Sequence, residues 1–214
     1  MKIVDLTHTI HSNMPVYPGT EPPLFTNANS LEEHGFIEKK ITMFSHTGTH
    51  MDAPSHILSG GKSLDAYGIE HFLGTAYMIV LQNINSREIS LEDLRKYEAE
   101  ICNVDYLILN TGWCKYWGSQ EFFTGYPILS QEAATWLSEG FSLKGIGTDA
   151  ISIDYEDSLN FPIHKIFFKN ELVVIENLNN LDHLKDQKFQ FCCFPLKTKD
   201  ADGAPIRAIA VTHE

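Results

Sequence analysis

The segment from residue 46 to residue 56 constrains this chain more than any other part of its sequence. It reads His-Thr-Gly-Thr-His-Met-Asp-Ala-Pro-Ser-His, so three histidines and one aspartate fall within eleven residues. Imidazole and carboxylate groups are ligands that zinc and other first-row divalent metals accept in proteins. The segment therefore predicts a fold built around a metal centre, to which this one stretch contributes most of the ligands.

The local sequence disfavours a helix here, although His46 and His50 have a spacing that would place both on one helix face. Gly48, the two threonines and Pro54 are poor helix formers, and the helical H-E-x-x-H pattern of metalloproteases is absent. We expect a strand end that runs into a tight turn, with the strand supplied by residues 36–44. Gly48 would adopt a φ that only glycine tolerates, and Pro54 would stiffen the exit.

Two further residues could act as ligands. His164 follows Pro162 by two positions, at the expected first turn of a short helix, and Glu176 follows the apolar run 172–175, an expected buried strand. A carboxylate at that position is costly to bury unless it is paired or bound to metal. On the residues alone, a surface histidine and an exposed glutamate remain open alternatives.

The other histidines lack coordinating neighbours, and we expect ordinary surface or core residues there. They are His8, His11, His34, His71, His183 and His213.

The pattern H-x-G-T-H-x-D-x-P-x-H resembles the signature of the cyclase-type metal hydrolases, which include bacterial kynurenine formamidases and isatin hydrolases. The resemblance extends over nearly the whole chain. Residues 4–10 (VDLTHTI) and 14–19 (MPVYPG) resemble the start of the family pattern, residues 147–154 (GTDAISID) its middle, and His164 with residues 174–178 (VIENL) its second metal-binding half.

The resemblance implies the fold and the roles of the site residues. The fold would be α/β, a single mixed-sheet domain over residues 1–214 of the swivelling β/β/α-like type. Two divalent ions, zinc or manganese, would be bound by five residues, with Asp52 bridging and His56 as the acid/base group. The implied ligands are His46, His50, Asp52, His164 and Glu176.

The implied activity is hydrolysis of a small non-peptide amide by a metal-activated hydroxide, with an arylformamide such as N-formylkynurenine as substrate. One departure weakens the assignment of that substrate: residues 17–20 read Tyr-Pro-Gly-Thr, where formamidases usually have Trp-Pro-Gly-Asp. An isatin hydrolase-like enzyme that opens a cyclic amide or lactone is the alternative. A non-catalytic metal-binding member is the other, although His56 favours an enzyme. The sequence contains no G-x-S-x-G nucleophile motif.

Composition favours an enzyme of ordinary globular type. Hydrophobic residues make up 43% of the chain, and the formal net charge of −12 argues against nucleic-acid or anionic-membrane partners. No apolar run reaches membrane-spanning length, and the N-terminal region has no secretory pattern, so we expect a cytoplasmic protein. The four cysteines have no C-x-x-C spacing, and we expect reduced thiols. The family resemblance also implies a homo-oligomer.

Apolar runs predict strands at 3–6, 76–81, 104–109, 143–147, 172–175, 189–194 and 206–211. Two helices are expected, at 90–101 after a capping-box-like start and at 130–140, where Gly140 would end the helix. The aromatic-rich stretch 112–126 is expected to be a packed surface loop, with a place at the active-site mouth as the alternative. Tyr17, Phe25 and Trp113 are treated in the same way as candidates to face the substrate.

Overall fold

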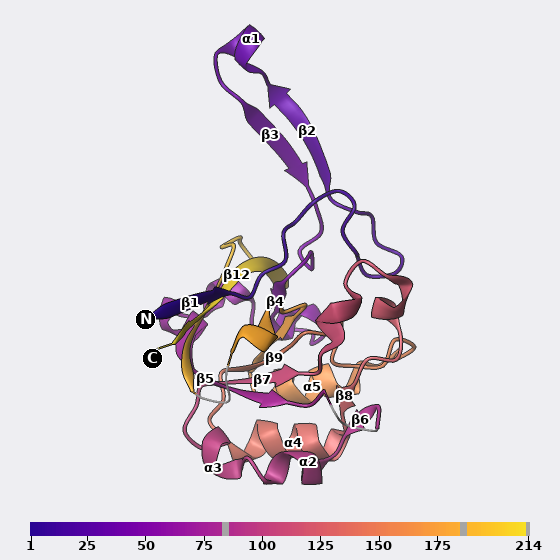
Figure 1. The fold of residues 1–214 in the computed structure, drawn as a ribbon, viewed down its shortest axis with the longest axis vertical. Helices are drawn as coiled ribbons and strands as arrows, with labels where there is room; N and C mark the ends of the chain where they lie inside the picture. The colour runs from indigo at the N-terminus through magenta and orange to yellow at the C-terminus, as the bar shows by residue number, and fades with distance from the viewer. Residues whose placement is uncertain (83–85, 185–187, 213–214) are drawn as a thin grey trace.

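A mixed β-sheet forms the centre of the computed structural model, which describes residues 1–82, 86–184 and 188–212. The sheet has eight strands in the order β1-β12-β11-β5-β7-β9-β10-β4 (Figure 1). Their bounds are β1 Lys2–Asp5, β4 His50–Asp52, β5 Leu73–Val80, β7 Tyr106–Asn110, β9 Gly145–Thr148, β10 Val173–Glu176, β11 Phe189–Pro195 and β12 Gly203–Thr212. Each strand predicted from an apolar run is present, so the mixed-sheet α/β fold class is confirmed.

The four parallel strands β5, β7, β9 and β10 are buried on both faces. Side chains along β5 alternate between two hydrophobic clusters: Ala76 and Met78 belong to one, and Tyr77 and Ile79 to the other. The second cluster also contains apolar residues of the helices α2 (Leu91–Arg95), α4 (Gln131–Gly140) and α5 (Pro162–Lys169). Burial on both faces explains why these strands read as continuous apolar runs rather than as an alternating pattern.

The sheet closes on itself because β12 pairs with three strands. Its first residues, Gly203–Pro205, pair with β4, and the remainder pairs with β11 and β1. The short strand β4 therefore lies between β10 and β12, and the sheet takes a barrel-like form. This closure brings the histidine-rich segment next to strands from the second half of the chain.

A two-stranded hairpin projects from this body (Figure 1). It consists of β2 (Leu24–Asn29), the single-turn helix α1 (Leu31–His34) and β3 (Glu38–Thr42). The strand expected within residues 36–44 is present as β3, but the expectation that it runs directly into the histidines is wrong. It ends at Thr42 as the returning arm of the hairpin, and His50–Asp52 forms a strand of its own.

The helix expected at 90–101 is divided into α2 and α3 (Glu98–Ile101). The predicted capping box is present, with the Ser90 side chain and Asp93 bonding each other's backbone N–H groups. The backbone tightens after Arg95, where the Tyr97 N–H donates to the Leu94 carbonyl, and Tyr97 packs against the second cluster. Packing of that ring therefore outweighs helix propensity. The helix expected at 130–140 is α4, and the short helix expected at His164 is α5.

The smaller elements connect this framework. Strands β6 (Glu88–Ile89) and β8 (Ile128–Leu129) form a two-stranded parallel pair. The 3₁₀ turns are Pro54–His56, Leu64–Ala66, Ile69–Phe72, Trp113–Tyr116, Gln120–Phe123 and Leu181–His183. All four cysteines are free thiols, as the sequence predicts. Within the described ranges, no helix is long and apolar enough to cross a membrane.

Candidate metal centre and active site

Strand β4 presents two coordinating side chains on one face. His50 and Asp52 are two residues apart on a strand, so both point to the same side, and the intervening Met51 is buried in the core on the other side. The antiparallel register sets Glu176 of β10 directly opposite His50. Residues distant in sequence thereby meet on one face: the His50 Nε2 atom lies 3.4 Å from a Glu176 carboxylate oxygen.

The loop before β4 places His46 over the same face. Gly48 has φ +67°, as the sequence predicts, and its carbonyl accepts a 2.8 Å hydrogen bond from His50 Nδ1. The His46 ring lies against the backbone of Gly203, where an added Cβ would come within 2.5 Å of the ring. His46 Nδ1 is 2.6 Å from Asp52 Oδ1. A glycine on the facing strand therefore leaves the space that the His46 ring occupies.

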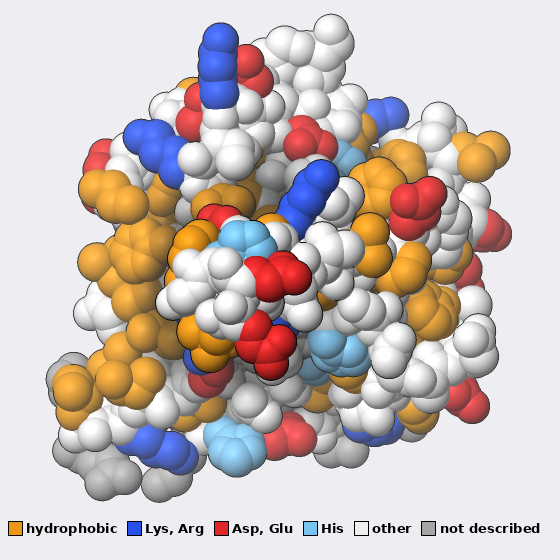
Figure 2. Space-filling view, turned by 90° about the horizontal axis from the view of Figure 1, so that it is seen from above, with side chains coloured by type: hydrophobic (Ala, Val, Ile, Leu, Met, Phe, Trp, Pro, Cys, Tyr) orange, Lys and Arg blue, Asp and Glu red, His pale blue; other side chains and the backbone are white. Residues whose placement is uncertain are grey.

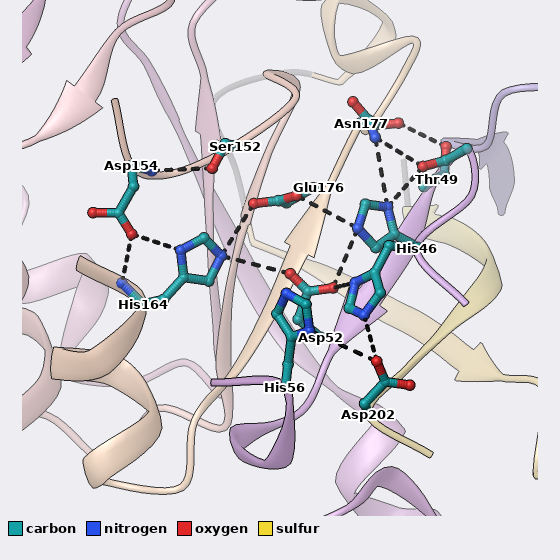
Figure 3. Close-up of polar contacts among 12 residues, drawn as sticks. His46, Thr49, Asp52, His56, Ser152, Asp154, His164, Glu176, Asn177 and Asp202 are labelled. Atoms are coloured by element: carbon teal, nitrogen blue, oxygen red, sulfur yellow. Dashed lines mark hydrogen bonds and ion pairs between the residues drawn. The ribbon is translucent and has the colours of Figure 1, made fainter. Parts of the chain in front are cut away.

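Helix α5 supplies His164, whose orientation depends on Asp154. The Asp154 carboxylate accepts hydrogen bonds from the backbone N–H groups of Ile163 and His164, and one from His164 Nδ1 at 2.6 Å. The first two bonds satisfy N–H groups at the helix start, where no intrahelical acceptor exists. The third fixes the ring so that Nε2 faces Glu176 at 3.3 Å and Asp52 at 3.6 Å (Figure 3).

These side chains form two adjoining groups that could each hold a divalent ion. One contains His46, His50 and Asp52, the other Asp52, His164 and Glu176, and the donor atoms within each group lie within 4.8 Å of one another. Asp52 belongs to both: its Oδ1 faces His46 and His50, and its Oδ2 faces His164.

The donor chemistry of both groups fits a metal ion. Glu176 Oε1 is buried and makes no hydrogen bond among the described residues, although His164 Nε2 lies 3.3 Å away. A buried carboxylate oxygen without a hydrogen bond is costly, and a bound cation would satisfy it. Imidazole and carboxylate donors suit zinc and are compatible with manganese.

The electrostatics of the cluster reflect its mixed charges. Burial lowers the pKa of His50, but the Asp52 and Glu176 carboxylates more than offset this and raise it to about 10. The buried Asp52 carboxyl has its pKa held well below the usual range by His46, His50 and His164, against the effect of burial. Protonated imidazoles would therefore balance the negative charge of the carboxylates. A bound metal cation would balance the same charge.

His56 lies beside this cluster, on the turn that Pro54 begins. Its ring centroid is 3.9 Å from that of His46, and its Nδ1 is 3.7 Å from an Asp202 oxygen. Burial lowers the pKa of His56, and the neighbouring His46 and His164 oppose its protonation. A neutral imidazole at this position can accept a proton from a group in the cavity.

All six predicted site residues line a single cavity of about 360 Å³. Its walls include Tyr17, Thr20 and Trp117. The departure from the formamidase pattern at residues 17–20 therefore lies on the cavity wall. Trp117 also places part of the 112–126 stretch at the mouth, whereas Phe25 and Trp113 are not among the lining residues.

Sequence reasoning missed four residues around the site. Asp154 and Asp202 each bond a histidine of the cluster, and the Asn177 side chain donates to the Gly48 carbonyl. His8 is buried and stacks on Trp117 with ring centroids 3.8 Å apart. His8, Asp154 and Asn177 lie inside the segments that resemble the family pattern, which could have drawn attention to them, whereas no such segment contains Asp202.

The remaining histidines differ little from expectation. His11, His34 and His183 are exposed, and His71 is half-buried. His213 lies outside the described residues.

Comparison with known proteins shows which proteins this chain is similar to. A family model described as "Putative cyclase" matches residues 4–155. The kynurenine formamidase of Bacillus cereus (strain ATCC 14579) is 32% identical over 207 residues, which cover 96% of this chain and 95% of that protein. The kynurenine formamidase of Bacillus anthracis is 32% identical over 209 residues, covering 97% and 96%.

Solved structures also match over nearly the full length. Isatin hydrolase A from Labrenzia aggregata superposes with a TM-score of 0.87 at 26% identity, covering 98% of this chain and 93% of that one. A "potential metal-dependent hydrolase with cyclase activity" gives a TM-score of 0.82 at 26% identity, covering 98% and 96%.

Fold and site together define an α/β protein in which histidines and carboxylates from distant strands converge on one cavity. Since the family model covers most of the chain and the formamidase relatives align along almost all of it, this chain belongs to the cyclase family.

Proposed function

We propose that this protein is a metal-dependent hydrolase of a small non-peptide amide, with an arylformamide such as N-formylkynurenine as its substrate. The observation that carries the proposal is the pair of donor groups sharing Asp52 at the base of a cavity, with His56 beside them. The kynurenine formamidase relatives, which align along almost the whole chain, support the choice of amide.

Each site residue takes a definite role in this proposal. Asp52 would serve two divalent ions, zinc or manganese, because its two oxygens face different donor groups. His46 and His50 complete one site, and His164 and Glu176 complete the other. Bound ions of this kind supply a water of lowered pKa and polarise a carbonyl oxygen.

The protein's own groups position the substrate and move the proton. His56, whose pKa is lowered by partial burial, would take a proton from the attacking water and return it to the leaving nitrogen. The aromatic rings of Tyr17 and Trp117 in the cavity wall suit an aryl group. Asn177 holds the Gly48 carbonyl at 2.8 Å, and that carbonyl fixes the His50 ring.

The second candidate is a ring-opening hydrolase of the isatin type, favoured by the fold match to isatin hydrolase A. The same side chains would act on a cyclic amide or lactone, with ring opening in place of formate release. A non-catalytic metal-binding role is the third candidate, and the neutral His56 in the cavity argues against it.

Turnover of defined substrates decides among these candidates. Purified protein loaded with zinc or manganese would be assayed with N-formylkynurenine, formanilide, isatin and a simple aryl lactone. Formate release from the first two supports the proposal. Ring opening alone would replace it with the isatin-type activity, and turnover of none would leave the metal-binding role.

We also propose two ions per chain, tested by elemental analysis of gently purified protein. A saturated value near two is expected. A value near one would remove Asp52 as a bridging ligand, while a hydrolase with a single ion would survive.

We further propose that residues 1–214 act as one domain in a cytoplasmic homo-oligomer. The hairpin supports the oligomer, because a two-stranded hairpin is marginally stable alone and this one exposes Leu31, Phe36 and Ile37. Figure 2 shows hydrophobic side chains exposed on the face of the molecule seen from the hairpin side. A second copy of the chain would cover these side chains. Light scattering at micromolar concentration should give at least a dimer, and Phe36→Ser with Ile37→Ser should weaken it. A monomeric wild-type protein would contradict the proposal.

A further inference from the structure

Asp202 occupies an unusual position at the rim of the site. It is the last residue before β12, and its backbone carbonyl accepts a 2.9 Å hydrogen bond from Ala53, next to the turn that carries His56. One side-chain oxygen, Oδ2, lies 3.0 Å from His46 Nε2 and 3.7 Å from His56 Nδ1. A single oxygen therefore faces two rings with different roles in the proposed function (Figure 3).

We propose that Asp202 is a positioning residue that holds the metal ligand His46 and the acid/base group His56 in one fixed arrangement. This inference rests on the proposed function. In this proposal Asp202 acts through the two histidines rather than as a ligand of its own.

The first part of the argument concerns His46. Its Nδ1 faces Asp52 and the first donor group. When Nδ1 binds an ion in that group, the outer nitrogen, Nε2, carries the proton and needs an acceptor. Asp202 Oδ2 provides it. A second hydrogen bond at 3.3 Å, from the Ser45 hydroxyl, holds the same oxygen in place. Acceptors of this kind fix the tautomer and the ring orientation of a ligating histidine.

The other two histidine ligands follow the same rule. His164 donates a hydrogen bond from Nδ1 to Asp154, and His50 donates one from Nδ1 to the Gly48 carbonyl. All three ligands thus present one nitrogen to the ion sites and the other to a fixed oxygen. Of the three groups that accept these hydrogen bonds, Asp202 is the one that also lies close to His56.

The second part of the argument concerns His56. Its ring packs on the His46 ring at 3.9 Å, and both rings meet the same carboxylate oxygen. With Nδ1 turned toward Asp202, the remaining nitrogen is free for the cavity that His56 lines. Loss of the carboxylate would therefore release two rings at once, one from the metal and one from the substrate.

An alternative is that Asp202 is itself a ligand. Its oxygen, His46 and His56 form a third group of possible donors within 4.8 Å. An ion there would have to replace the proton on His46 Nε2 while Nδ1 serves the first site. Because an outer imidazole nitrogen ordinarily donates a hydrogen bond when the inner one ligates, we assign Asp202 to positioning.

Metal affinity is the first test and needs no substrate. Asp202→Asn keeps the shape and the backbone contact to Ala53 but removes the charge. Chelator competition should show binding of one of the two ions weakened about 10- to 100-fold, with the melting temperature of the metal-free protein unchanged. The matched control is Asp200→Asn, an exposed carboxylate two residues away, which should bind both ions like wild type.

A double-mutant cycle at saturating metal is the second test. Asp202→Asn should lower kcat in the wild-type background about tenfold or more, yet have no further effect on His56→Ala, because both changes remove the same positioned ring. Ring ¹⁵N signals of His56 should also shift in Asp202→Asn and stay in place in Asp200→Asn, which reads the coupling without turnover.

Three results would overturn the inference. They are unchanged metal affinity in Asp202→Asn, a kcat effect of the same size in both backgrounds, and a third ion per chain that this variant loses. Absence of turnover on every candidate substrate would refute the proposed function instead, and the affinity and ¹⁵N measurements would still decide the role of Asp202.

Discussion

The two sides of the site differ in their exposure to solvent. The inner side contains His164, Glu176 and Asp154, and the His164 and Glu176 side chains are only 5% and 7% exposed. The rim side contains His46, His56 and Asp202, and the last two side chains are 36% and 48% exposed. Asp52 lies between them and faces both (Figure 3).

The two sides therefore have different tasks: the inner side fixes metal ligands within the fold, and the rim side faces the substrate. On the inner side, Asp154 joins the start of helix α5 to the His164 ring, and His164 Nε2 lies 3.3 Å from Glu176 Oε1. The rim side reaches the cavity and the solvent, where a substrate enters and a proton leaves. Changes on the inner side should therefore cost both metal and stability. Changes at the rim should leave the stability of the metal-free protein unchanged, and should cost rate at His56 and metal affinity at His46 and Asp202.

The largest effect is expected from Asp52→Ala, which abolishes the distinction between the two sides. Both donor groups lose their shared oxygen pair, so both ions and all measurable turnover should be lost together. Asp52→Asn, which leaves less empty space, should behave in the same way. Elemental analysis and turnover check this, with the exposed Asp157→Ala as a control. Two ions retained in Asp52→Asn would contradict the bridging role.

His56→Ala tests the rim side alone. The variant should keep most of its metal yet lose about 10²- to 10⁴-fold in kcat, the usual contribution of a positioned acid/base group. Metal content and turnover are measured on the same sample. A metal-free variant would make His56 a ligand, and a fully active one would assign the proton transfer to another group.

Asp154→Asn tests the inner side alone. The carboxylate accepts three hydrogen bonds from helix α5, so its charge serves both the helix and the ring. We expect metal affinity to fall about 10- to 100-fold and the melting temperature of the metal-free protein to fall as well. The lower melting temperature of the metal-free protein would distinguish this variant from Asp202→Asn. An unchanged melting temperature would remove the distinction between the two aspartates.

Gly203→Ala should give the smallest effect. The new Cβ would lie 2.5 Å from the His46 ring and push it off its position. We expect affinity for one ion to fall about tenfold, the low end for a disturbed ligand orientation. Gly140→Ala is the control, because its nearest side-chain atom is 4.0 Å away. Equal affinity in both variants would show that the His46 ring has room to move.

The sequence predicts the parts of the molecule that depend on local chemistry. The apolar runs correspond to the buried strands, Ser90 and Ser130 begin the expected helices, and Gly48 has the expected positive φ. The donor-rich segment 46–56 could be recognised because its ligands are close together in the chain. Family resemblance was needed to add His164 and Glu176, which have no such neighbours.

What the sequence could not predict depends on tertiary contacts. Residues 36–44 have the composition of a strand, but nothing in them indicates that this strand pairs with β2. The hairpin therefore could not be distinguished from a strand that leads directly to β4. The helical pattern of 90–101 is divided near Tyr97, whose ring packs on the same cluster as Leu94 and Ile101. Asp154 and Asp202 gain their roles only from the histidines they face, and single aspartates in turns are common.

The pairing of β4 with both β10 and β12 has a consequence for the order of folding. His50 and Glu176 are separated by more than half the chain, and Asp52 pairs with Gly203 from the last strand of the sheet. Contacts between such distant positions form slowly, because a long loop must close first. During synthesis the histidine-rich segment leaves the ribosome long before its partners exist. The second donor group, which needs His164 and Glu176, can therefore form only once the barrel has closed, whereas the ligands of the first all lie within residues 46–52.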